Sequence, residues 1–531
     1  MNCTDCPETT DQVKVQPLTP HPFYHLRLHL MVLASRTPGT RPPRHLKNNP
    51  FHQGHLHHLL AGIPGPQSVA RRIWCRPSLH CTPSQGALLT LIYKKRYGSW
   101  WKSEIGKYRM VNIADPVLLE VVLRQEGKYP LRNEIDLWRL HRELRNVSYG
   151  PFTERGEKWH SLRTVLNQKM LKPKEAKSYA RSINEVVSDF MVRLQDLRKQ
   201  SPSGETVNDM ASEMYRFAFE GVSCIVFETR MGCLEKNIPP ETQRFIDSIN
   251  QMFRNTVFVT FLPEWTRRVL PYWDRYMENW DNVFDYGKKL VDKKMSEIQA
   301  RLDSREEVQG EYLTHLLSNG KLSLPEVYGS VCELLMAGVD TTSNTLCWSL
   351  YHLAREPELQ QTLYEEITKA VPMDCVPEAD DITHMPLLRA VIKETLRLYP
   401  VVPTNARIIS EHEVVIGDYK FPKNTLFAIN HYAISRDEAN FKDSEKFYPQ
   451  RWLRDGGMTH HPFSSIPFGY GLRACVGKRI AELEMHLALS RIIKMFEVKP
   501  DAKMENVKPM ARIVLSPSEK INLRFIERRS A

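Results

Sequence analysis

The chain has 531 residues, of which 25% are charged and 42% hydrophobic, so its composition is that of an ordinary globular protein with a sizeable core. Its net charge of +11 favours an acidic partner or an anionic membrane surface. No zinc finger or RNP-like run accompanies this charge, so we expect no nucleic-acid partner. The 10 cysteines are scattered and few for the length, which predicts a reducing compartment and no disulfide framework.

The N-terminal part differs in composition from the rest. Between Gln12 and Ser103 there are 13 Lys or Arg residues and no Asp or Glu, which is typical of an organelle transit segment. Acidic residues before Gln12 depart from that pattern, and a disordered extension is the alternative. No apolar run of about 18 residues is present that could span a bilayer. We expect residues 1–86 to form an N-terminal extension, interpreted as a mitochondrial transit segment, and residues 87–531 to form one domain.

The segment from Phe258 to Leu270 mixes large apolar residues with Arg267 and Arg268. Such a segment can lie in a lipid interface. The sequence therefore predicts peripheral membrane contact without a spanning helix. Burial of the same residues in the core is the alternative.

Helical periodicity dominates the predicted domain. Ser323-Leu324-Pro325-Glu326 combines a capping serine, a proline in the first turn and a glutamate at the third position. Apolar periodicity continues to about Arg355, so we expect a helix of roughly 48 Å. A second helix is predicted over Met385–Tyr399, and short β-type segments over Glu413–Ile416 and Leu426–Ile429. These features predict a mainly α domain with a minor β-sheet region.

Ala337-Gly338-Val339-Asp340-Thr341-Thr342 lies inside the predicted long helix. A glycine in a helix interior costs about 1 kcal/mol relative to alanine, so a compensating gain is expected, such as the close approach of a flat ligand. Thr341 could hydrogen-bond bound dioxygen or an ordered water, and Asp340 could relay protons from solvent. A kinked helix with a satisfied hydroxyl group is the alternative that this motif leaves open.

Glu394 and Arg397 stand at positions i and i+3 of the predicted helix Met385–Tyr399, so their side chains can meet. Alone, such a pair is usually a solvated salt bridge that contributes little to stability. Arg451 follows within a long, irregular, proline-punctuated stretch.

The run Phe468-Gly469-Tyr470-Gly471-Leu472-Arg473-Ala474-Cys475-Val476-Gly477 is the most informative part of the chain. Gly469 and Gly471 allow backbone dihedrals that a side chain would forbid, so the loop can turn tightly under a flat ligand. Arg473 is a permanent cation that could pair with a carboxylate of that ligand. Cys475 supplies a thiolate, which suits iron or zinc, and the helix predicted over Arg479–Phe496 would favour the thiolate through its N-terminal dipole.

This run is compatible with two other interpretations. A lone cysteine is usually a small buried hydrophobic residue. The run also fits the dinucleotide-binding pattern G-x-G-x-x-A, but no convincing strand precedes it and a helix occupies the place of the second strand.

The run resembles the haem-binding loop F-x-x-G-x-R-x-C-x-G of the cytochrome P-450 monooxygenases, in which a cysteine thiolate holds the haem iron. Ala337–Thr342 is similar to the oxygen-activating motif [AG]-G-x-[DE]-T of that family. The resemblance extends from about Leu88 to Ile526 and is closest to the mitochondrial class, within it the sterol 26/27-hydroxylases. It implies the cytochrome P-450 fold, a helical haem domain with a minor β-sheet region.

The resemblance also implies roles for individual residues. Cys475 would ligate the iron of heme b with Phe468 beside the cofactor, and Thr341 and Asp340 would be catalytic. Glu394 and Arg397 match the family's structural motif E-x-x-R. Arg451 sits where the third partner of that motif is expected, although Gln450 departs from the frequent form P-E-R-F. The haem propionates need cations or donors, and the residues at matching positions are Trp159, Arg163, Arg407 and Arg473.

The resemblance implies electron delivery by another protein, because no flavin domain is recognisable in the sequence. That partner would be an adrenodoxin-like [2Fe-2S] ferredoxin with its NADPH-dependent reductase, at the matrix side of the mitochondrial inner membrane. The expected docking residues are basic: Arg389, Lys393, Lys478 and Arg479. A merely solvated basic face is the alternative.

The substrate does not follow from composition. The pocket-lining positions implied by the family are mainly apolar and suit a sterol or many other lipids: Met336, Ala337, Val402, Thr404, Val514 and Leu515. The likeness to sterol 26/27-hydroxylases implies hydroxylation of a terminal side-chain methyl of cholesterol or of a bile-acid precursor. Vitamin D side-chain hydroxylation is the nearest alternative, and a haem-thiolate isomerase or lyase and a haem-binding sensor are more distant ones.

Overall fold

The computed structural model describes residues 86–528 except residues 106–107, 133–135, 307, 309, 455–458, 503, 505 and 512. Almost all of the predicted N-terminal extension, residues 1–86, lies outside the described residues, so its role and its boundary stay predictions. The first described helix, α4, begins at Gly86.

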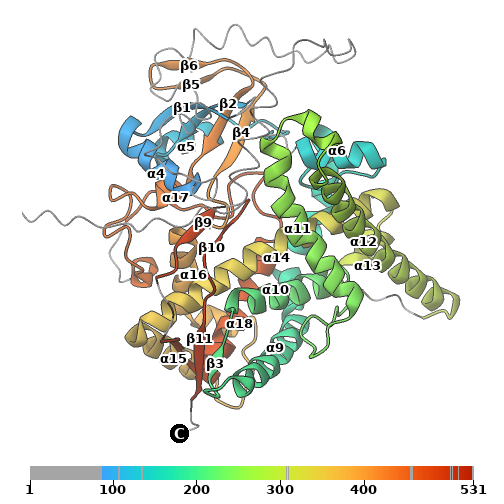
Figure 1. Ribbon diagram of the computed structural model, residues 1–531, viewed down its shortest axis with the longest axis vertical. Helices are drawn as coiled ribbons and strands as arrows, with labels where there is room; N and C mark the ends of the chain where they lie inside the picture. Colours follow the sequence, from blue (N-terminus) through green and yellow to red (C-terminus); the bar gives the residue numbers. More distant parts are fainter. Residues whose placement is uncertain are drawn as a thin grey trace, which may run out of the picture. The chain divides into compact units, whose positions relative to one another are not determined.

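Helices make up most of the described chain (Figure 1). The α-helices are α4 (Gly86–Tyr97), α5 (Pro116–Leu123), α6 (Asp136–Arg145), α7 (Gly156–Met170), α8 (Pro173–Ser178), α9 (Ala180–Gln200), α10 (Met210–Val226), α11 (Pro240–Phe261), α12 (Tyr272–Asp303), α13 (Tyr312–Ser318), α14 (Leu324–Arg355), α15 (Pro357–Ala370), α16 (Pro386–Leu398), α17 (His431–Ser435) and α18 (Lys478–Met495). Short 3-10 helices are η2 (Glu264–Arg268), η3 (Asp381–His384), η4 (Pro449–Trp452) and η6 (Pro462–Ser464).

The strands are short and form small sheets at the edges of the helical part (Figure 1). They are β1 (Trp100–Ile105), β2 (Tyr108–Ile113), β3 (Thr206–Val207), β4 (Asn405–Ile409), β5 (Val414–Ile416), β6 (Tyr419–Phe421), β7 (Thr425–Ile429), β8 (Phe496–Pro500), β9 (Pro509–Ala511), β10 (Leu515–Pro517) and β11 (Leu523–Glu527). The largest sheet has the order β1-β2-β7-β4, in which β2 and β7 are parallel and the other pairs antiparallel.

Helix α14 is the central element of the helical part and packs against α10, α16 and α18 (Figure 1). Its start has the predicted capping box, in which the Glu326 carboxylate accepts a hydrogen bond from the backbone N–H of Ser323 at 2.8 Å. It runs for 32 residues to Arg355. The predicted long helix is therefore confirmed at both ends.

The other predicted elements agree with the structure. The helix predicted over Met385–Tyr399 is α16, and the two β-type segments correspond to β5 and β7. The mainly α fold class with a minor β region is confirmed. Within the described residues, no helix combines the length and the apolar character needed to cross a membrane.

Candidate active site

The cysteine loop has the tight backbone that its glycines predict. Gly469 and Gly471 adopt left-handed φ angles of 75° and 71°. The loop is closed by a hydrogen bond from the backbone N–H of Cys475 to the carbonyl of Phe468 at 2.8 Å. Cys475 thus stands directly before α18 and is exposed, whereas its neighbour Val476 is buried.

The surroundings of the Cys475 thiol act on its pKa in opposite directions. Cys475 has an exposed surface, but desolvation by the protein atoms around it raises the pKa of its thiol, whereas the backbone N–H of Gly477 and the charge of Arg163 lower it. A soft metal ion bound to the sulfur would replace the proton, because metals bind the thiolate. An accessible cysteine in a fixed loop could therefore hold a metal ion.

Helix α7 brings Trp159 and Arg163 beside this loop, one helical turn apart. The guanidinium carbon of Arg473 lies 3.6 Å from the centre of the Trp159 ring. Arg473 Nε donates to the carbonyl of Pro130 at 2.8 Å. Arg163 donates to the carbonyl of Ala474, next to the cysteine. These predicted residues are therefore assembled around the loop.

Arg407 reaches the same place from β4, and it forms an ion pair with Glu126. The backbone N–H of Ile408 donates to the carbonyl of Leu131 at 2.9 Å, which places Arg132 in the neighbourhood of Arg407. Glu126 and Arg132 were not predicted as site residues. Arg132 carries no local motif from which its place in the site could be predicted.

Cations outnumber the acids that oppose them in this cluster. Burial comes first among the causes that lower the pKa values of Arg473 and Arg132, and the charges of the neighbouring arginines Arg407 and Arg163 lower both further. Glu126 acts in the opposite direction on Arg473. Trp159 Nε1 and Arg132 Nε are buried and have no hydrogen-bond partner among the described residues. Such a cluster suits a buried ligand that carries carboxylate groups. The two propionates of haem would be such groups.

On α14, the predicted oxygen-activating residues lie in a continuous helix. Thr341 Oγ1 donates to the carbonyl of Ala337 at 2.9 Å, so the hydroxyl group is satisfied within the helix. Thr341 and Asp340 are both half-buried. Asn344 Nδ2 donates to the backbone carbonyl of Asp340 at 2.7 Å.

Gly338 has a packing role that the sequence did not predict. A Cβ atom at this position would lie 2.9 Å from Cγ2 of Val222 on α10. Close packing of α14 on α10 is therefore one compensating gain, and the approach of a flat ligand stays a prediction.

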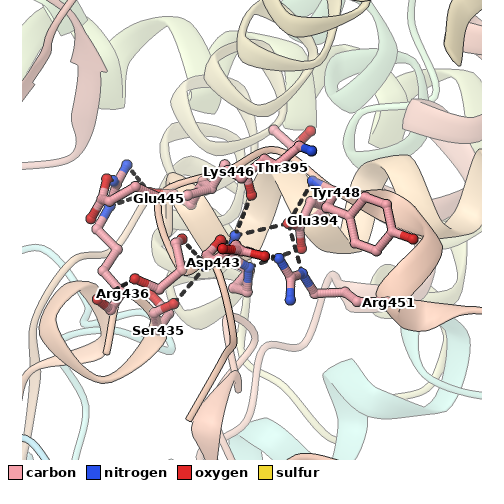
Figure 2. Close-up of polar contacts among 12 residues, drawn as sticks. Glu394, Thr395, Ser435, Arg436, Asp443, Glu445, Lys446, Tyr448 and Arg451 are labelled. Atoms are coloured by element: carbon pink, nitrogen blue, oxygen red, sulfur yellow. Dashed lines mark hydrogen bonds and ion pairs between the residues drawn. The ribbon is translucent and has the colours of Figure 1, made fainter. Parts of the chain in front are cut away.

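Glu394, Arg397 and Arg451 form a buried network (Figure 2). Arg397 Nη2 donates to Glu394 Oε1 at 2.8 Å, and Arg451 Nε donates to the same oxygen at 3.0 Å. The side chains of the three residues are 0%, 0% and 1% exposed, so the solvated salt bridge that the spacing alone suggested is wrong. Two further donors, Trp452 Nε1 at 2.8 Å and the backbone N–H of Tyr448 at 2.9 Å, complete the carboxylate's partners and were not predicted.

The network also fixes the irregular stretch that precedes the cysteine loop. Arg397 Nη1 donates to the carbonyls of Ser435 and Ser444 at 2.8 and 2.6 Å, and Arg451 Nη1 to that of Lys442 at 3.0 Å. Helix α16 therefore anchors backbone that has little secondary structure of its own.

Comparison with known proteins agrees with this architecture. The family model described as Cytochrome P450 matches residues 78–525. The chain belongs to the cytochrome P450 family. Among curated relatives, "Sterol 26-hydroxylase, mitochondrial" of Homo sapiens is 51% identical over 448 residues, which cover 83% of this chain and 84% of that protein. The protein of the same name from Rattus norvegicus is 51% identical over 477 residues, covering 88% and 89%.

Another curated relative and a solved structure are also similar to the chain. "25-hydroxyvitamin D-1 alpha hydroxylase, mitochondrial" of Homo sapiens is 40% identical over 481 residues, covering 88% of this chain and 93% of that protein. The crystal structure of the cytochrome P450DA heme domain superposes with a TM-score of 0.71 at 22% identity, covering 84% of this chain and 94% of that one. The latter shows the fold, and the expected cytochrome P450 fold is confirmed.

In this cytochrome P450, the predicted docking residues share one surface. Arg389 and Lys393 of α16 and Lys478 and Arg479 of α18 are exposed, and α16 packs against α18. We call these four residues the docking patch. Partial desolvation lowers the pKa of Lys393, and the charges of Arg389 and Lys478 lower it further, as expected for cations gathered on one face.

The six predicted pocket-lining positions differ in exposure. Met336 and Leu515 are buried, Ala337 and Val514 are half-buried, and Val402 and Thr404 are exposed. The backbone N–H of Leu515 donates to the carbonyl of Val401 at 2.8 Å, which brings the hairpin of β9 and β10 to the segment that carries Val402. Helix α14 packs against β10. Their contact with substrate stays a prediction.

The predicted membrane segment covers the end of α11, η2 and the residues that follow. Phe258, Trp265 and Val269 are 43%, 46% and 65% exposed, whereas Thr266 is buried. Burial of the large apolar side chains in the core, the alternative reading, does not hold for these three residues. Their exposure leaves an apolar surface free for another contact.

Proposed function

We propose that this cytochrome P450 is a haem-thiolate monooxygenase that hydroxylates the side chain of a sterol, at a terminal methyl group of cholesterol or of a bile-acid precursor. The observation that carries the proposal is the 51% identity to the sterol 26-hydroxylase of Homo sapiens over 84% of that protein. Vitamin D is the second candidate substrate, and the lower identity of 40% to the 25-hydroxyvitamin D hydroxylase makes it the weaker one.

The residues of the site fit heme b. Cys475 would hold the iron, and Trp159, Arg163, Arg407 and Arg473, with Arg132, would hold the propionates. A haem bound through a cysteine thiolate supplies cleavage of the O–O bond of dioxygen. The buried donors without partners and the excess of cations support this assignment, because propionates would satisfy both.

The chain itself supplies groups that can hold and move protons on α14. The Thr341 hydroxyl donates to Ala337, and its oxygen keeps lone pairs that can accept a hydrogen bond from a water or from another proton carrier. The carboxyl group of Asp340, on the adjacent residue, can exchange protons with solvent. The apolar side chains of Met336 and Leu515 would hold a lipid substrate and exclude water from it.

Electrons would come from an adrenodoxin-like [2Fe-2S] ferredoxin and its NADPH-dependent reductase. The docking patch supports this partner, since exposed cations attract an acidic protein and steer its approach. Peripheral contact through Phe258, Trp265 and Val269 would place the enzyme at the matrix side of the mitochondrial inner membrane, where an apolar substrate is dissolved.

Product analysis tests the proposal. Purified protein with ferredoxin, reductase and NADPH is given a mixture of cholesterol, bile-acid precursors and vitamin D, and the products are identified by mass spectrometry. We expect side-chain hydroxylated sterols that form only when ferredoxin is present. Products confined to vitamin D would favour the second substrate, whereas turnover without NADPH would indicate an isomerase or lyase. NADPH consumption without any oxygenated product would contradict the whole assignment.

A further inference from the structure

One acidic side chain lies within the docking patch. Glu482 is one helical turn beyond Lys478 on α18, with 3.9 Å between Lys478 Nζ and Glu482 Oε1, and its side chain is 30% exposed. Lys478, Glu482 and His486 occupy positions i, i+4 and i+8, so they share one face of α18. Helices α16 and α18 pack against each other, and Arg389 and Lys393 of α16 lie close enough to Glu482 and His486 to act on both electrostatically.

The charges around Glu482 come from both helices. Burial raises the pKa of Glu482, and the charges of Lys478, Arg479, Lys393 and Arg389 lower it. Glu482 is therefore within the field of all four cations of the patch, whereas Glu366 is affected by Arg389 alone among them. His486 adds no charge at neutral pH, because burial and the charges of Arg389 and Lys393 lower its pKa to about 4.

We propose that Glu482 is a built-in competitor for the acidic face of the ferredoxin, pairing with the docking patch when the partner is absent and limiting how tightly the partner binds. The inference rests on the proposed function, because it takes the ferredoxin as the occupant of this patch. The carboxylates of an approaching partner meet Glu482 as a like charge and compete with it for the same ammonium and guanidinium groups.

The consequence is faster release of the partner. A ferredoxin that delivers electrons one at a time must dissociate and be replaced between transfers. An affinity for the docking patch below the attainable maximum therefore allows faster exchange and faster turnover. The partial burial of Glu482 matters here, because a half-buried charge is screened less by salt and water than a fully exposed one.

A purely structural role for Glu482 makes a different prediction. If the carboxylate served only to hold α16 and α18 together, its neutralisation would lower the melting temperature and leave ferredoxin binding unchanged or weaker. If it competes with the partner, neutralisation strengthens binding while the melting temperature changes little.

The test measures ferredoxin affinity of the haem-loaded, full-length protein by titration at low and at physiological ionic strength. Glu482→Gln should lower the dissociation constant several-fold at low salt, because it removes a charge of the same sign as the partner's carboxylates, and the gain should shrink as salt increases. Glu482→Asp, which keeps the charge, should bind like the unmodified protein. Glu278→Gln, at an exposed glutamate of α12, changes the net charge equally away from the patch and should have no effect.

Lys393→Glu, measured in parallel, separates this inference from the proposed function. Weaker binding of Lys393→Glu together with unchanged or weaker binding of Glu482→Gln would overturn the competitor role and leave the docking site standing. Unchanged binding of both variants would overturn the docking site and the competitor role together.

Discussion

Glu484 on α18 carries a carboxyl group that lies deep in the core. It is 0% exposed, and neither of its oxygens has a hydrogen-bond partner among the described residues. Its Oε1 lies 1.8 Å from the place that a Cβ on Gly221 of α10 would occupy. Desolvation raises the pKa of Glu484 to about 8, so the folded protein holds a neutral carboxylic acid at pH 7.

This raised pKa predicts a pH-dependent loss of stability. Between pH 4.5 and about 8 the folded state binds the Glu484 proton and the unfolded state does not, so the free energy of unfolding falls as pH rises, by about 1.4 kcal/mol per pH unit from this group. Above about pH 8 the contribution is fully lost. Glu484→Gln should remove this slope, as measured by denaturant unfolding from pH 5 to 9. An identical pH dependence of the two proteins would contradict the neutral acid.

At the residue scale, the sequence predicted the site residues that belong to recognisable motifs. It missed the residues that only a contact between distant segments of the chain brings to the site. Cys475 and Arg473 are recognisable because their loop requires glycines at fixed spacing. Arg132 joins the site only because Leu131 pairs with Ile408 of β4, and no local pattern encodes that pairing. The polar partners of Glu394 were missed in part for the same reason, since Tyr448 contributes only its backbone N–H.

Helices α10 and α14 are in close contact at Gly338, and the energetic effect of this glycine can be measured. Gly338→Ala gains about 1 kcal/mol of helix propensity but places a methyl group 2.9 Å from Val222. We expect overpacking to dominate, with a net loss of about 1–2 kcal/mol in the free energy of unfolding. Val222→Ala in the same chain should recover most of that loss. A Gly338→Ala variant that is more stable than the parent protein would contradict the packing role.

The buried charges of helix α16 also contribute to stability, and their effect on the free energy of unfolding can be measured. Glu394→Gln leaves Arg397 and Arg451 buried without their carboxylate, so we expect a loss of about 3–5 kcal/mol in the free energy of unfolding. The exposed pair of Lys420 and Glu413 offers a control, because Glu413→Gln should cost less than about 1 kcal/mol. Equal losses for the two variants, measured by denaturant unfolding, would contradict the network's role as an anchor.

At the element scale, helix ends could be predicted because they depend on local chemistry. The capping box of Ser323 and Glu326 and the proline after Arg355 set the limits of α14 from neighbouring residues alone. The partners of a helix cannot be derived in this way. The reason for Gly338 became apparent only when α10 was seen to lie against it.

For the whole molecule, the exposed apolar residues Phe258, Trp265 and Val269 predict where it contacts a membrane. Replacing Phe258 and Trp265 by serine should lower the fraction bound to anionic lipid vesicles several-fold in a flotation assay, because most of the insertable apolar area is removed. Val192→Ser is a matched control, since Val192 is 59% exposed on α9. Equal losses for the control and the double variant would contradict a contact localised to this segment.

The fold class and the family could be predicted from sequence because helical periodicity and the cysteine loop are both local signals. The strand order β1-β2-β7-β4 could not be predicted from sequence. It pairs segments about 300 residues apart, such as Val111 with Phe427, and the closing of such a long loop has no signal in the local composition. The predicted pocket-lining positions stay a prediction: Met336 and Leu515 are buried, and Val402 and Thr404 are exposed.

The account depends most on Cys475 as the ligand of the haem iron, and the spectrum of the reduced, carbon monoxide-treated protein tests this directly. We expect the strongly red-shifted Soret band of a thiolate-ligated haem in the unmodified protein. The band should persist in Cys375→Ala, at another exposed cysteine, and disappear in Cys475→Ala. Absence of the band from the unmodified protein, or its survival in Cys475→Ala, would contradict the account.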